Sequence, residues 1–334
     1  MRLFNSPIVK NASWIIACKI VQAVLNLIIS MITARYLGPS NYGLINYAMS
    51  VVSFFAPIMN LGISNILVNE ILDGQQKEHE ILGTAIGLTS ISALLCMVGT
   101  GAFVSLVNAG ETETIVVCLL YSVSLLAQSW ELIRFWFQAM YLSKYTAVVM
   151  LTTYAVISVY KIAILVAQKS VYWFAVANAL DYFLIAMTLM VIYRKISGHW
   201  LRFSSTTACK LMSKGRYYII SNMMVTLFAQ TDRIMIKMIN GETAVGYYSA
   251  AMTIAGMTTF VFVAIIDSMR PAILSNKSKD RAIYEGNIRK LYCLIIYLAF
   301  IQSIAIVFLA NYIVPILYGS AYLPAVKTLR IMIW

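Results

Sequence analysis

The chain has 334 residues, of which 61% are hydrophobic and 11% are charged, and its formal net charge is +12. A typical soluble domain has about 45–50% apolar and about 25% charged residues, so this composition excludes an ordinary soluble fold. The basic residues lie between apolar runs, as they do in the cytoplasmic loops of membrane proteins. The positive charge therefore indicates membrane topology, and we expect no nucleic-acid partner.

Nine segments contain the roughly 20 mostly apolar residues that a membrane-spanning helix needs. In chain order they are 13–34, 43–68, 81–107, 115–139, 145–167, 171–193, 217–239, 245–268 and 291–314. The first is too long for a cleavable signal peptide, so we expect it to be a signal anchor. The residues from Ala325 to Trp334 look like the opening of a tenth helix, which suggests a truncated or partial chain.

Lysine and arginine fall mainly in alternate connections, above all in 194–216 and 270–290. If the N-terminus is cytoplasmic, the outer loops hold only Arg35, Lys169 and Lys237. The positive-inside rule then predicts a multi-pass protein with its N-terminus in the cytoplasm. The connections are short, so they leave no room for a folded soluble catalytic domain.

The few potential metal ligands do not form a pattern. The five cysteines are scattered without a Cys-x-x-Cys motif, and His79 and His199 lie far apart in expected loops. We therefore predict no metal site and no cofactor.

A shift of 203 residues takes Gly38 to Gly241 and Gly43 to Gly246, so that each copy has a Gly-x4-Gly turn between two spans. Six expected helices separate the copies, and an even number gives both the same orientation, as in transporters built from parallel repeats. We predict an all-α polytopic membrane bundle of two pseudo-symmetric six-helix lobes. The N-terminal lobe would cover 1–200, and the truncated C-terminal lobe 201–334.

Polar residues recur at three- and four-residue steps on the first and seventh helices, so each set lies on one helical face. The sets are Lys19, Gln22, Asn26, Ser30 and Thr33, and Asn222, Thr226, Gln230, Arg233 and Lys237. A charge near the centre of a spanning helix costs roughly 2.5–3.5 kcal/mol on insertion scales, so such residues should face water or each other. The other polar residues expected in the membrane include Gln128, Glu131, Arg134, Lys161, Asp181 and Asp232.

Some of these charges have simpler explanations. Glu131 and Arg134 are three residues apart and could pair with each other. Lys19 is near the cytoplasmic end and could extend to the interface. Asp232 and Arg233 point about 100° apart, so mutual pairing cannot satisfy both. Arg233 is therefore the strongest candidate for a cavity residue.

The segment Ala34-Arg35-Tyr36-Leu37-Gly38-Pro39-Ser40-Asn41-Tyr42-Gly43 resembles the turn after the first helix of bacterial polysaccharide (O-antigen) flippases. These belong to the multidrug/oligosaccharidyl-lipid/polysaccharide exporter superfamily. Similar matches are Trp136–Ala139, Thr231–Ile236, Val245–Ser249 and the region from Leu317 to Ala325. The resemblance implies two six-helix lobes, often followed by two further helices.

The resemblance also implies a function: moving an undecaprenyl-pyrophosphate-linked oligosaccharide across the bacterial inner membrane. Membrane lipids, a polysaccharide polymerase and chain-length proteins would be partners. On this hypothesis rocking lobes alternate access, and the acids Glu131, Asp181 and Asp232 couple ion movement. The substrate would be bound by Lys19, Gln22, Asn26, Gln128, Arg134, Lys161, Gln230 and Arg233.

Two other functions stay open. A membrane glycan polymerase or glycosyltransferase usually needs a sizeable outer loop or paired acids, whereas Glu111 and Glu113 have no obvious partners in the sequence. We therefore expect no catalytic residues and no enzyme activity. A multidrug exporter of the same superfamily would favour an acidic cavity for cationic drugs, but here cations outnumber acids.

Overall fold

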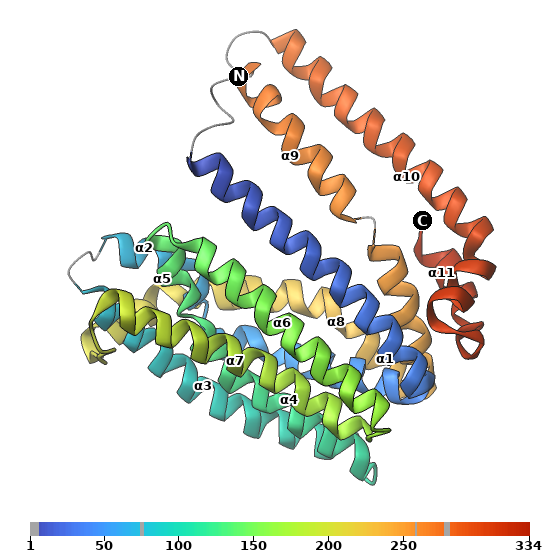
Figure 1. Ribbon diagram of the computed structural model, residues 1–334, viewed down its shortest axis with the longest axis horizontal. Coiled ribbons are helices and arrows are strands. Elements are labelled where there is room, and N and C mark those ends of the chain that lie inside the picture. Colours follow the sequence, from blue (N-terminus) through green and yellow to red (C-terminus); the bar gives the residue numbers. More distant parts are fainter. Residues whose placement is uncertain (1–6, 74–76, 258, 277–280) are drawn as a thin grey trace. The chain divides into compact units, whose positions relative to one another are not determined.

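The computed structural model describes residues 7–73, 77–257, 259–276 and 281–334, and all regular elements in these ranges are helices (Figure 1). They are α1 (Pro7–Asn60), α2 (Ile63–Asp73), α3 (Glu78–Val107), α4 (Thr112–Glu131), α5 (Arg134–Ala139), α6 (Ser143–Val166), α7 (Val171–Ser197), α8 (Ser205–Gly256), α9 (Thr259–Asn276), α10 (Arg281–Tyr318), a 3₁₀ turn (Ser320–Tyr322) and α11 (Ala325–Met332). The prediction of an all-α fold is confirmed.

Helix α1 contains the first two predicted spans, joined at Gly38. This glycine has φ 72° and ψ 172°, a conformation open almost only to glycine, and Pro39 follows it. Ser30 Oγ and Tyr42 OH lie 3.0 Å apart. Twelve residues of straight helix would separate them by about 18 Å, so the chain folds back at Gly38.

Helix α8 has the same kind of break at Gly241, with φ 80° and ψ −179°. The predicted repeat pairs this glycine with Gly38, and both positions have the same rare backbone conformation. This agreement supports the internal repeat. The division into lobes at residue 200 stays a prediction.

Six helical segments in the described residues are long and apolar enough to cross a membrane. They are Val21–Asp73, Glu78–Val107, Thr112–Ala139, Ser143–Val166, Val171–Ser197 and Tyr284–Tyr318. The first would be about 80 Å long if straight, against about 30 Å of bilayer hydrocarbon, and the break at Gly38 divides it into two crossings. Seven of the nine predicted spans thus have counterparts of sufficient length and apolarity.

The two exceptions lie in α8 and α9. The predicted span 217–239 is helical, but its polar stripe lowers its mean hydropathy. The predicted continuous span 245–268 is wrong, because α8 ends at Gly256 and α9 begins at Thr259. The second predicted span also ends early, because Leu61 (φ 53°) and Gly62 (φ 67°) separate α1 from α2.

The described chain separates into two compact units, residues 1–245 and 246–334. In the first, α4 packs against α3 and α7, while α1 packs against α3, α4 and α6 (Figure 1). One apolar core surrounds Tyr47, Tyr121 and Phe174, and another surrounds Phe137 and Tyr193. In the second unit, α10 packs against α9 and α11.

Large apolar side chains also cover the outside of the helices. Val98 is 73% exposed on α3 and Phe228 is 93% exposed on α8. Soluble monomers rarely expose contiguous apolar surface on this scale, whereas a bilayer solvates it. The chain is therefore a multi-pass membrane protein.

Candidate functional site

A polar groove of about 390 Å³ runs between α8 and a wall formed by the second half of α1 and the start of α2. Its polar side chains carry hydroxyl or amide groups and no charge, and small apolar residues separate them. The lining residues are Ser53, Ala56, Pro57, Asn60, Ser64, Asn222, Val225, Thr226, Ala229 and Gln230. Such a surface offers hydrogen bonds to a neutral polar solute and has apolar patches for its carbon atoms.

Three of these residues, Asn222, Thr226 and Gln230, belong to the polar stripe predicted for the seventh helix. The opposite wall was not predicted. It comes from α1 beyond Gly38 and, through Ser64, from the start of α2, where hydroxyl and amide side chains are too few to show a helical period. The described lining includes no member of the stripe predicted for the first helix.

Beyond one end of the groove, α1, α2 and α8 come into close contact. Asn222 Nδ2 donates to Asn65 Oδ1 at 3.1 Å. A Cβ atom on Gly62 would lie 2.2 Å from the carbonyl oxygen of Gly215, so only glycine permits this backbone approach. Farther along, Glu70 is buried and pairs with Lys210 at 2.6 Å and with Lys214.

Arg233 and Gln230 lie toward the other end. Arg233 Nη1 donates to Gln230 Oε1 at 2.8 Å, and the buried Nε has no hydrogen-bond partner among the described residues. Asp232 Oδ1 accepts the backbone N–H of Arg233 at 2.7 Å. Arg233 thus keeps hydrogen-bonding capacity for an anionic group next to the uncharged groove.

Beyond Arg233, Lys237 lies in an ion-pair cluster that the sequence did not reveal. Its side chain is 5% exposed, and Nζ lies 2.6 Å from Glu111 Oε2 and 3.2 Å from Glu242 Oε1. Thr114 Oγ1 lies 2.9 Å from an oxygen of each carboxylate, so its single hydroxyl hydrogen can be donated to either. The expectation that Glu111 lacks partners is wrong, because those partners come from segments more than 100 residues away as well as from nearby.

Two further sets of predicted charged residues lie on α4 to α7, outside the lining of this groove. Glu131 Oε1 accepts from Arg134 Nη1 at 2.7 Å, so these residues pair as the simpler explanation expected. Lys161 on α6 and Asp181 on α7 attract each other, and the buried Asp181 Oδ1 has no hydrogen-bond partner among the described residues.

The remaining predicted binding residues are dispersed. Gln128 Nε2 donates to Ser124 Oγ on the same helix at 3.3 Å. Asn26 Oδ1 accepts from Tyr154 OH at 3.0 Å, which links α1 to α6. Gln22 is half-buried on α1. The side chain of Lys19 lies outside the described residues.

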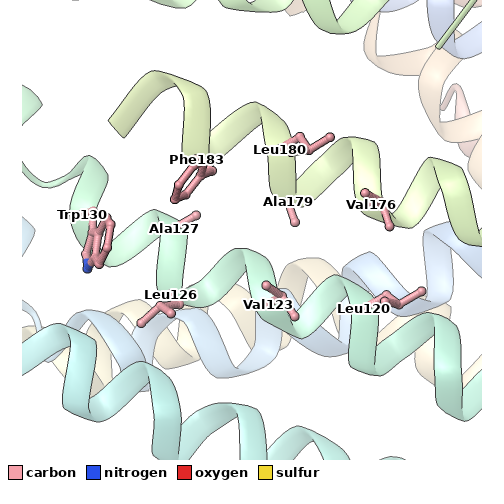
Figure 2. A pocket seen from close by; sticks show the side chains of 9 residues that line it. All are labelled: Leu120, Val123, Leu126, Ala127, Trp130, Val176, Ala179, Leu180 and Phe183. Atoms are coloured by element: carbon pink, nitrogen blue, oxygen red, sulfur yellow. The ribbon is translucent and has the colours of Figure 1, made fainter. Parts of the chain in front are cut away.

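A second groove, of about 350 Å³, lies between α4 and α7 and is entirely apolar in character (Figure 2). Its polar atom, Trp130 Nε1, donates to Ser90 Oγ at 3.2 Å. Figure 2 shows Trp130 and Phe183 toward one end, with aliphatic side chains along the rest. Its described lining offers no free hydrogen-bonding group for a sugar hydroxyl or a phosphate.

The two histidines lie side by side, contrary to the expectation from sequence. Their rings stack with centroids 5.3 Å apart and planes 17° apart, and His79 lies in α3 rather than in a loop. Within the described ranges, no group of three or more potential ligands could hold a metal ion.

The comparisons with known proteins agree with the fold. A family described as "Polysaccharide biosynthesis protein" matches residues 8–277. A solved structure described as the inward-facing conformation of a multidrug resistance MATE family transporter of the MOP superfamily is similar, with a TM-score of 0.62 and 14% identity. The match covers 93% of this chain and 76% of the other. No curated protein sequence matches.

Proposed function

Because this chain belongs to the polysaccharide biosynthesis protein family, we propose that it flips a lipid-linked oligosaccharide, an undecaprenyl-pyrophosphate-linked O-antigen or similar repeat unit, across the bacterial inner membrane. The observation that carries the proposal is the polar groove between α1 and α8, in a bundle whose outer surface is apolar. The sequence-based topology puts the N-terminus in the cytoplasm, with polysaccharide polymerase and chain-length proteins as further partners.

The groove suits the uncharged part of such a substrate. A sugar presents hydroxyl groups that must exchange hydrogen bonds with water for hydrogen bonds with protein, because unpaired polar groups are costly to bury. Asn60, Asn222, Thr226 and Gln230 supply both donors and acceptors. The lipid tail would stay in the bilayer while the glycan follows the groove.

The anionic part of the substrate requires a cation. Arg233 is adjacent to the groove through Gln230, and a guanidinium fork matches phosphate oxygens better than an ammonium group does. Lys19, Arg134 and Lys161 stay proposed contacts, although Arg134 and Lys161 already have acidic neighbours. Glu131, Asp181 and Asp232 stay proposed ion-coupling residues.

The proposal is tested by export of surface polysaccharide in a bacterium that lacks its own flippase and carries the matching glycan-synthesis genes. The unmodified protein should restore export, and Asn60→Leu with Gln230→Leu should reduce it by roughly tenfold or more, because two hydrogen-bonding groups become apolar. Phe228→Leu is the matched control, since it alters an exposed side chain on the same helix.

Membrane extraction and thermal unfolding establish that each variant is present and folded. Failure of the unmodified protein to restore export of any matched glycan would contradict the flippase proposal. Resistance to cationic drugs without glycan export would instead favour the multidrug exporter, and incorporation of sugar into polymer would favour an enzyme.

A further inference from the structure

We propose that Lys237, Glu111 and Glu242 form a clasp that closes one end of the polar groove, and that the clasp opens when solute passes between the groove and that side of the membrane. The proposal rests on the transport function above, but it concerns a set of residues outside the proposed substrate site. Its test measures access to the groove and needs no substrate.

The clasp joins elements that are distant in the sequence. Glu111 precedes α4 in the connection from α3, whereas Lys237 and Glu242 lie on either side of the break at Gly241 in α8. The bond from Lys237 to Glu111 crosses between these elements, and so does the 2.9 Å hydrogen bond from Thr114 to Glu242. The pairing of Lys237 with Glu242 stays within α8.

The position of the clasp follows from how α1 and α8 run past each other. Asn65 contacts Asn222, and the ring centre of Tyr47 lies 5.8 Å from Lys237 Nζ, so the two segments are antiparallel. The groove residues of both segments lie between these two contacts. Lys237 lies seven residues beyond Gln230, or about 10 Å along the helix, at the end that the sequence places outside.

The partial exposure of the clasp residues to water favours an ion pair that can separate. Lys237 is buried, but the side chains of Glu111 and Glu242 are 47% and 23% exposed. Separation of α8 from the start of α4 would return the half-exposed Glu111 carboxylate to water, while Lys237 would keep its pairing with Glu242 within α8. Separating a fully buried ion pair would cost far more free energy, because both charges would be left without partners in a dry interior.

Further hydrogen bonds set the geometry of the closed clasp. Asn108 Nδ2 donates to Glu111 Oε2 at 3.0 Å, and Asn108 Oδ1 accepts from Tyr47 OH at 2.8 Å. Asn108 therefore positions the Glu111 carboxylate, and Tyr47 on α1 in turn positions Asn108. Neither of these contacts depends on Lys237. This preorganisation allows the clasp to re-form after each opening.

The test labels a groove cysteine, Thr226→Cys, with a membrane-impermeant maleimide from each side of sealed vesicles, in protein whose native cysteines are replaced. A second cysteine, Ala109→Cys, marks the side on which the clasp lies. Glu111→Gln removes the carboxylate charge that pairs with Lys237 across the elements and leaves Lys237 paired with Glu242, so the protein should fold. Labelling of Thr226→Cys from the marker's side should then be about tenfold faster, as expected when a charge-assisted hydrogen bond becomes a weaker neutral one.

Glu113→Gln is the matched control, because it removes a neighbouring carboxylate of α4 that is not among the ion-pair partners of Lys237 in the described part of the chain. Replacing Glu70 with Gln, together with Lys210→Met and Lys214→Met, tests the opposite end and should leave labelling from the marker's side unchanged. An unchanged labelling rate in Glu111→Gln would overturn the clasp proposal. An equal rise in labelling rate in all variants would also overturn it, because it would show that every substitution loosens the helix packing. If the unmodified protein exports no glycan but Glu111→Gln still speeds labelling of the groove cysteine, only the flippase function is contradicted.

Discussion

Arg233 donates to Gln230 through one nitrogen and leaves Nε without a partner in the described part of the chain. The sequence predicted it as a cavity residue because it continues a polar stripe and cannot be satisfied by the adjacent Asp232. Its place next to the polar groove fits that interpretation. The substrate contact itself remains a prediction.

We expect Arg233→Lys to reduce polysaccharide export by roughly tenfold and Arg233→Ala by more, because lysine keeps the charge but loses the planar fork. Export in the complemented strain measures the effect, with protein level as the reference. If Arg233→Lys exports as well as the unmodified protein, bidentate phosphate binding by this residue is excluded.

The pair of Glu131 and Arg134 shows that the role of a charged residue depends on the partner that it meets in the fold. Glu131 is 7% exposed and Arg134 is 42% exposed, so arginine is the partner that reaches water. We expect Arg134→Met to destabilise the protein by a few kcal/mol, because it leaves a buried carboxylate unpaired. Adding Glu131→Gln should recover most of the loss.

Thermal unfolding in detergent measures both variants. A double variant that is as unstable as Arg134→Met alone would show that the pairing contributes nothing and that arginine packing matters instead.

At the scale of elements, the two glycine breaks decide where helices reverse. Gly38 and Gly241 have positive φ, and an added Cβ at either would meet no atom within 4 Å. A substitution there acts through backbone strain alone. We expect Gly38→Ala and Gly241→Ala each to lower stability by about 1–3 kcal/mol.

Gly256→Ala is the matched control for the glycine breaks. It also meets no atom within 4 Å, but its φ is not positive, so alanine should be tolerated there. Unfolding temperatures of the three variants test the comparison. Equal stability of all three would show that the breaks do not require glycine.

Element boundaries were the least predictable feature of the fold. Hydropathy placed most helices within a few residues, because a spanning helix must be apolar over a fixed length. It could not place the interruption after Gly256, because the apolar run continues through it. The short helix α5 was likewise merged with α4 in a single expected span.

At the scale of the whole molecule, the Lys237 clasp makes stability depend on pH. The hydrogen bond from Lys237 is the main reason that the pKa of Glu111 is below its usual range. A lowered folded-state pKa stabilises the protein above the unfolded pKa of about 4.3, and that contribution is lost as the pH falls through the folded pKa.

We therefore expect the unmodified protein to be more stable than Glu111→Gln at pH 7, and the difference to shrink below about pH 4.3. Unfolding temperatures of both proteins across this pH range measure it. A difference that is constant with pH would show that Glu111 is not held ionised by Lys237.

The sequence by itself determined the class of the protein, because apolar runs of bilayer length leave few alternatives to a helical membrane bundle. It also determined the turns at Gly38 and Gly241, since a backbone conformation that requires glycine is a local property. The polar stripe of the seventh helix was visible for the same reason, because helical period depends only on neighbouring residues.

Tertiary structure alone decided which polar groups meet. The wall formed by Ser53, Asn60 and Ser64, the partners of Glu111, and the stacking of His79 on His199 all depend on contacts between distant segments. An isolated charge in a sequence does not identify its partner, because the energy of a charge in a membrane depends on what packs against it. The groove and the clasp therefore became visible only once α8 was placed against α1 and the start of α4.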